Sequence, residues 1–196
     1  SISGSPDSVE EIRPNWPLPA RLVPRLSFPP YRYIPGQAPH PTANPDGHSF
    51  GRGEHAKPLT LTGWNSHENY LFGFDLFNHG YWWEAHENWE GIWHATTDED
   101  LRTLLQILIQ LAAAFLKAHS HQERGVAAFC ARITGRLAGL RARHESLAGL
   151  NLDALTSITK QLFEHRIQFG SSAFIANNFP VLIPGHEAKD EASRPS

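Results

Sequence analysis

Residues 81–94 read YWWEAHENWEGIWH, and they contain four of the six tryptophans and two of the twelve histidines in a chain of 196 residues. At 100° per residue, a helix places Trp82, His86, Trp89 and Trp93 within about 60° of one another on one face. A tryptophan-rich face of this kind is expected to pack in a core or an interface, with a ligand pocket as the lesser alternative. The stretch therefore predicts a helix with one packed face.

Prolines divide the rest of the sequence into three parts. Twelve of the 15 prolines lie within residues 6–58, and none lies within residues 59–179. Because a proline inside a helix costs about 3 kcal/mol, helices can run only in the proline-free interval. We therefore expect an extended arm over residues 1–58, a helical domain over 59–169 and a tail over 170–196. The arm carries enough aromatic and aliphatic side chains to lie on the helical domain.

Five helices are expected within the domain, from cap residues and from apolar residues at helical spacing. They lie at about residues 66–78 and 81–95, after the cap region 96–98, at about 123–143, and after the cap Asn151. No stretch alternates with the period of a strand, except a short one at 179–183. The fold class is therefore all-α: a single multihelical bundle of about five helices with an extended proline-rich N-terminal arm.

Charge and cysteine content exclude several classes of protein. The formal net charge of −3 gives a field too weak to collect phosphate backbones, so we expect no nucleic-acid partner. The single cysteine, Cys130, excludes an internal disulfide and a thiol-rich metal site. The apolar run 104–116 is shorter than the roughly 20 residues that cross a bilayer, and residues 1–13 lack a signal-peptide pattern. No membrane association is expected, and a cytoplasmic location is the default.

The helix at 81–95 carries candidate metal ligands. His86 and Glu90 are four residues apart, so their side chains can converge on one ion. Glu87 is placed like the general base of the H-E-x-x-H zinc motif, although Glu90 replaces the second histidine here. The chain has no E-x-x-H pair, so a di-iron site has little support. The alternative is a buried network in which imidazole, carboxylates and indole N–H groups satisfy one another.

The arm offers two more imidazoles. His40 stands between two prolines, and His48 follows an Asp-Gly pair. A backbone fixed by proline holds a ligand at little entropic cost. If the arm folds over the helix at 81–95, His40 and His48 can meet His86 and Glu90 and complete a set of three nitrogens and one oxygen. The other interpretation is that both are surface histidines in turns.

Three segments, LFNHGYWWEAHENWEGIW at 76–93, LLQILIQLAAAFLKAH at 104–119 and RGVAAF at 124–129, resemble the domain-of-unknown-function 309 family. The first segment matches the family's N-x-G-x-(Y/F)-(F/W)-E-A-H-E-x-x-E-x-x-W pattern except at Trp82, which stands at the Tyr/Phe position. In the other two, Ile107 stands where the family usually has Gly, and Val126 where it usually has Ala. The resemblance covers about residues 70–140. It implies a small multihelical all-α fold that often self-associates, and it implies no reaction.

Two functions from different classes follow. The leading hypothesis is a metal-binding helical protein, extended to a metal-assisted hydrolase, with His40, His48, His86 and Glu90 as ligands and Glu87 as the base. Zinc is the first choice of ion, with manganese, iron and copper left open, and the small-molecule substrate is unidentified. The alternative is a non-catalytic interaction module, in which the Trp and Glu stripes form a homodimer or partner interface.

Overall fold

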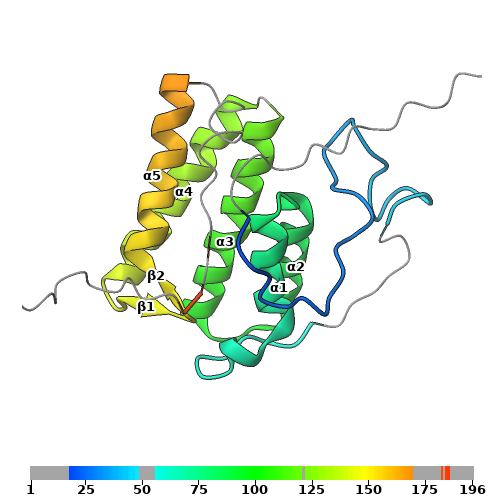
Figure 1. The fold of residues 1–196 in the computed structure, drawn as a ribbon. Helices are drawn as coiled ribbons and strands as arrows, with labels where there is room; N and C mark the ends of the chain where they lie inside the picture. Colours follow the sequence, from blue (N-terminus) through cyan, green and yellow to red (C-terminus); the bar gives the residue numbers. More distant parts are fainter. Residues whose placement is uncertain (1–17, 49–55, 121, 170–181, 183, 186–196) are drawn as a thin grey trace, which may run out of the picture.

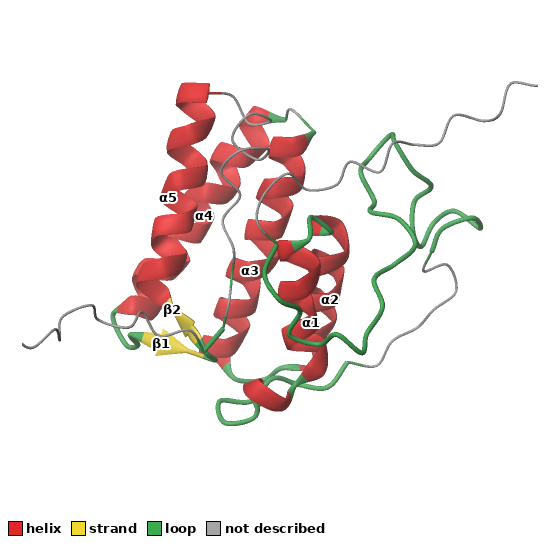
Figure 2. Ribbon diagram, viewed as in Figure 1, coloured by secondary structure: helices red, strands yellow, loops and turns green. Residues whose placement is uncertain are grey.

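The fold is seen in a computed structural model, which describes residues 18–48, 56–120, 122–169, 182 and 184–185. Its elements are the short 3-10 turn η1 (Trp64–Ser66), the helices α1 (Glu68–Asn78), α2 (Trp82–Ala95), α3 (Glu99–His119) and α4 (Glu123–Arg141), the strands β1 (Ser146–Leu147) and β2 (Leu150–Asn151), and the helix α5 (Leu152–Phe169). The predicted all-α class with five helices is confirmed, and the bundle is seen in Figures 1 and 2.

Two predicted helix caps are present. The Asp98 side chain accepts the Leu101 N–H at 2.9 Å at the start of α3, and Asn151 Oδ1 accepts the Ala154 N–H at 2.9 Å at the start of α5. Each bond satisfies one of the backbone donors that a helix N-terminus leaves free. The short polar residues before these helices therefore set where they begin.

Two details of the helical domain differ from the sequence prediction. α1 begins two residues later than expected, because the cap is the His67 ring, whose Nδ1 accepts the Tyr70 N–H at 3.1 Å. The antiparallel pair β1–β2 was not predicted at all. Its strands have two residues each, too few to show an alternating pattern, and they are joined by Ala148 and Gly149 at φ 45° and 79°.

α3 is the central helix of the bundle. It packs between α2 and α4, while α1 lies on α2 and α5 lies on α4 (Figure 1). Ten of its residues are buried. In the described part of the chain, α3 is also the one helix long and apolar enough to cross a membrane, but more than half of its most apolar window is buried inside the protein, as in the core helix of a bundle.

Two of the α2 tryptophans belong to the core, as predicted. Trp82 is 2% exposed and stacks on Phe115, with ring centroids 6.1 Å apart. Trp89 is fully buried, and its Nε1–H donates to the Tyr70 carbonyl at 3.3 Å. Its ring lies over Gly73, where a Cβ atom would stand 2.1 Å from Trp89 Nε1. One face of α2 is thus committed to packing, whereas Glu87 and His94 on another side of the helix are exposed.

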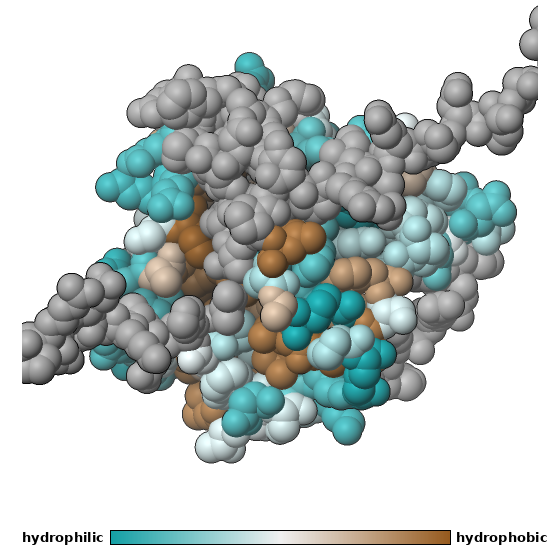
Figure 3. Space-filling view, viewed as in Figure 1, coloured by the Kyte–Doolittle hydropathy of each residue, from teal (hydrophilic) through white to brown (hydrophobic). Residues whose placement is uncertain are grey.

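The described part of the arm lies on α1 and α2 and is held there by two buried carboxylates. Asp75 on α1 accepts the backbone N–H groups of Leu22 at 2.7 Å and Val23 at 2.9 Å. Glu84 on α2 accepts the N–H of Tyr33 at 2.8 Å. In Figure 3 apolar residues gather near the middle of the face in view, and polar residues lie below them and to their right. The arm's backbone donors thus find partners on the helices, as buried polar groups require.

Candidate metal site

His86, Glu87 and Glu90 come together on the solvent-facing side of α2. Each offers one ligand atom, and the three atoms all lie within 4.8 Å of one another. His86 Nδ1 is 3.2 Å from Glu87 Oε1, and His86 Nε2 is 3.7 Å from Glu90 Oε2. Among the described residues, no other three His, Cys, Asp or Glu side chains converge in this way. The helical spacing of His86 and Glu90 therefore brings their side chains together as expected.

The group is partly open to solvent. The side chains of His86, Glu87 and Glu90 are 29%, 44% and 41% exposed. Two carboxylates beside one imidazole leave a negative centre, which favours a cation over an anion. His94, one turn further along α2, is 67% exposed and has its Nε2 3.9 Å from Glu90 Oε1. The arrangement offers an ion one nitrogen and two oxygens, with a second imidazole within reach.

His48 takes a different partner from the one predicted for it. Its Nε2 lies 2.9 Å from Glu84 Oε1, and the two side chains are only 2% and 4% exposed. Burial raises the pKa of the Glu84 carboxyl, and the hydrogen bond from His48 opposes part of that rise. The second oxygen of Glu84 is buried and has no hydrogen-bond partner among the described residues. Sequence reasoning missed Glu84, because its contacts depend on how the arm folds.

His40 lies against the same turn of α2. Its ring is 5.6 Å from that of Trp83 and 5.1 Å from that of Tyr33, between centroids. Its Nδ1 accepts the N–H groups of Thr42 at 3.3 Å and Ala43 at 3.1 Å, which closes a turn in the arm. The arm histidines thus contact the first turn of α2, and the group of three ligand atoms contains neither of them. Sharing of one ion by all four predicted ligands stays a prediction.

The tryptophans that remain for an interface are few. Trp82 and Trp89 are core residues, so a partner could meet only the half-buried Trp83 and Trp93 of α2. Trp93 already lies under the Arg102 guanidinium, whose Cζ is 4.2 Å from the ring centroid. Within α2, the alternative interaction module would therefore have only Trp83 and Trp93 as partly exposed tryptophans.

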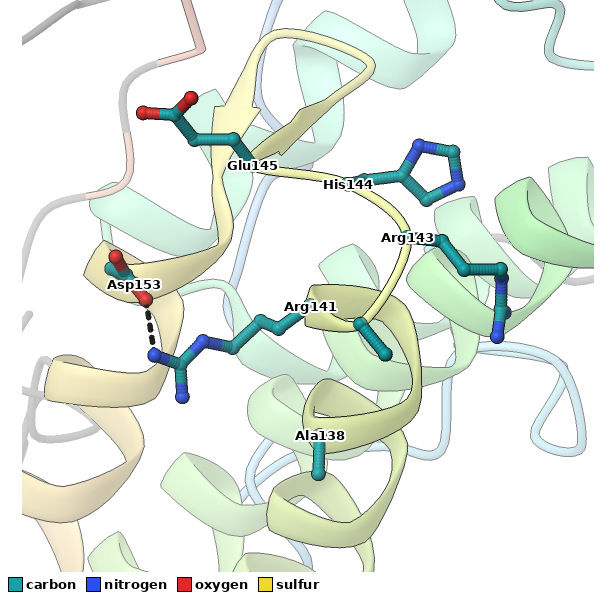
Figure 4. A pocket seen from close by; sticks show the side chains of 7 residues that line it. Ala138, Arg141, Arg143, His144, Glu145 and Asp153 are labelled. Atoms are coloured by element: carbon teal, nitrogen blue, oxygen red, sulfur yellow. Dashed lines mark ion pairs between the residues drawn. The ribbon is translucent and has the colours of Figure 1, made fainter.

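A shallow hollow of about 690 Å³ lies at the end of α4 (Figure 4). Its cationic side chains are already paired: Arg141 bonds to Asp153 at 2.5 Å, and Arg143 and His144 each bond to Asp100 at 2.6 Å. Hydrogen bonds from Arg143 and then His144 lower the pKa of Asp100 to about 2. With its charges neutralised in pairs, the hollow offers no free cationic side chain to an anion, and α2 remains the better candidate.

Comparison with known proteins finds one match. Residues 70–129 match the family model described as Domain of unknown function (DUF309). No curated protein matches the chain, and no solved structure does. The matched residues include nearly all of α1, the whole of α2 and α3, and the first part of α4, and therefore the three grouped ligands. The arm lies outside the match.

Proposed function

We propose that this chain, a member of the DUF309 family through residues 70–129, is a metal-binding protein that holds one divalent ion on α2. The observation that carries the proposal is the convergence of His86, Glu87 and Glu90, whose ligand atoms lie within 4.8 Å of one another. One imidazole nitrogen and two carboxylate oxygens suit zinc first, and also manganese or iron. His40 and His48 contact another turn of α2, so the proposed set is the helix-borne one.

A hydrolase is the finer form of the proposal. Catalytic zinc sites typically have three protein ligands and one position open to water, and the partial exposure of these three side chains would leave such a position. A divalent ion held there would lower the pKa of a bound water toward about 7, which would supply hydroxide as the nucleophile for an ester or amide at neutral pH. Glu87 is then either the third ligand or the base that takes the proton, and one substitution separates the two roles.

Metal binding is tested by calorimetric titration of ZnCl₂ and MnCl₂ into protein purified without an affinity tag and stripped with a chelator. We expect about one ion per chain and at least a tenfold loss of zinc affinity in His86→Gln, since one of three ligands is removed. His144→Gln is the matched control: its side chain is also 29% exposed and paired with a carboxylate, but lies in no group of three. Equal zinc affinity in both variants would overturn the proposal.

The role of Glu87 is tested with Glu87→Gln. If Glu87 is the base, zinc affinity stays near that of the unmodified chain and zinc-dependent hydrolysis of a nitrophenyl ester is lost. If Glu87 is a ligand, zinc affinity itself falls. Glu145→Gln, at an exposed position beyond α4, is the control for loss of surface charge. Absence of ester hydrolysis by the zinc-loaded unmodified chain would remove the finer proposal for this substrate class and leave the metal site standing.

A further inference from the structure

A short piece of the tail is held at the end of α1. Asn78 Oδ1 accepts the Leu182 N–H at 2.9 Å, and Asn78 Nδ2 donates to the Leu182 carbonyl at 2.8 Å. Both residues are buried, at 2% and 3% exposure. A carboxamide has its donor and acceptor side by side, so here it pairs with both backbone groups of one residue, as a neighbouring strand would. This contact recognises the backbone of residue 182 rather than a particular side chain.

The next residues add selectivity. Pro184 is buried, and the Gly185 N–H donates to the Gly149 carbonyl at 2.6 Å. Gly185 has φ +80°, and a Cβ there would lie 3.3 Å from the Trp64 ring. Gly149 approaches the same ring even more closely, since its own Cβ would stand 2.5 Å away. The surface therefore fits a leucine, then a proline, then a residue without a side chain.

We propose that Asn78, Trp64 and Gly149 form a dock for a Leu-x-Pro-Gly peptide, and that the chain's own residues 182–185 are its ligand. In the described part, three hydrogen bonds and the burial of Leu182 and Pro184 hold the segment. Its described residues belong to no helix or strand, and 184–185 form a turn, so the segment can leave as a unit while the bundle stays folded. The dock is independent of the metal site.

The chain is long enough to fill its own dock. α5 ends at Phe169 after 18 residues, which is a helix length of roughly 27 Å. The 13 steps from there to Leu182 can span at most about 43–47 Å, which exceeds the length of α5. A tethered ligand of this kind has an effective concentration of the order of millimolar, so it competes well with a free peptide.

The test uses the full chain and a fluorescent peptide with the sequence of residues 179–187, FPVLIPGHE, with binding followed by fluorescence anisotropy. Leu182→Glu places a charge in the buried position and frees the dock. We expect the peptide to bind this variant at least tenfold more tightly than the unmodified chain, whose dock is filled. Adding Asn78→Asp should weaken binding at least tenfold, because it replaces the donor to the leucine carbonyl with an acceptor. A peptide with glutamate in place of the leucine should not bind.

A second variant and a second measurement keep the proposal open to refutation. Gly185→Val should displace residues 182–185 from the dock, because a β-branched side chain disfavours φ +80° and meets Trp64. Gly185 is exposed, so this substitution places no charge in the core. In the unmodified chain, the Leu182 amide should exchange hydrogen faster than the amides of α3. Equal peptide affinity in all chains, no binding to a folded variant, or Leu182 protection as high as that of α3 would each overturn the proposal.

Discussion

At the scale of single residues, α1 packs closely on α2 at a position that has no side chain. Gly73 lies under the fully buried Trp89 ring, which leaves no room for even a methyl group. Protein interiors are packed densely enough that such a contact cannot relax without moving its neighbours. The position of the indole, and with it the rotation of α2 that turns His86 to solvent, therefore depends on a glycine at residue 73.

Gly73→Ala should lower the free energy of unfolding, although alanine is the better helix former. The propensity gain is about 1 kcal/mol, and forcing a methyl group against the Trp89 ring costs about 1–3 kcal/mol or more. Gly135→Ala in α4 is the control, because nothing lies within 4 Å of its Cβ position, and it should gain up to about 1 kcal/mol. Urea denaturation measures both; equal changes in the two variants would contradict the packing argument.

His79 gives the protein a predictable response to pH. Burial, and then the nearby Arg21 guanidinium, lower the pKa of His79 below its usual 6.5. Between that lowered pKa and 6.5 the unfolded chain binds more protons than the folded one, so the free energy of unfolding falls as the pH drops through this window. His79→Phe keeps a ring beside Phe28, whose centroid is 4.9 Å away, and removes the titration. The pH slope should be shallower in the variant; parallel curves would contradict the assignment.

At the scale of elements, the arm and the helices are joined through carboxylates rather than through a sheet. Asp75 receives two backbone N–H groups and Arg21 Nε, the last at 3.3 Å. The same guanidinium stacks on Phe28, 3.9 Å from its centroid. A charged acceptor binds N–H groups about twice as strongly as a neutral one, so a single side chain on α1 can hold a segment that has no regular structure of its own.

Asp75→Ala should therefore loosen the arm. Leaving the buried Val23 N–H without an acceptor costs about 1–3 kcal/mol, and the part-buried Leu22 N–H adds less, so we expect the free energy of unfolding to fall by about 2 kcal/mol. Glu68→Ala removes another arm contact of α1, the ion pair with Arg25, whose side chains are 63% and 46% exposed. That control should cost about 1 kcal/mol or less. Denaturation gives both values, and trypsin cleavage of the arm should accelerate only in Asp75→Ala.

The sequence predicted those features that depend on residues close together in the chain. The caps Asp98 and Asn151, the five helices and the meeting of His86 with Glu90 all follow from spacings of three or four residues. The pairing of Glu84 with His48 spans 36 residues and depends on the path of the arm, which no helical period records. The β1–β2 pair is too short to leave a pattern. Local order was therefore predictable, and the contacts between arm and helix were not.

At the scale of the whole molecule, the fold separates two polar sites on one helix. The first turn of α2 meets the arm through Trp83 and Glu84, and the following turns present His86, Glu87 and Glu90 to solvent. The packed face with Trp82 and Trp89 fixes both orientations at once. The arm's stability and the proposed ion should therefore depend on different residues, and a substitution can test each without the other.

His48→Ala is that substitution. It removes the buried hydrogen bond between His48 and the Glu84 carboxyl, and a buried polar group that loses its partner costs about 1–3 kcal/mol, so the free energy of unfolding should fall by that order. Zinc at a hundred times its dissociation constant adds about 2.7 kcal/mol to a protein that binds it only when folded. That increment should be the same in His48→Ala, in His40→Ala and in the unmodified chain, and absent in His86→Gln. If the arm variants lose this increment, the ion is bound at the junction of the arm and α2 instead. Thermal denaturation with and without zinc measures the increment in each variant.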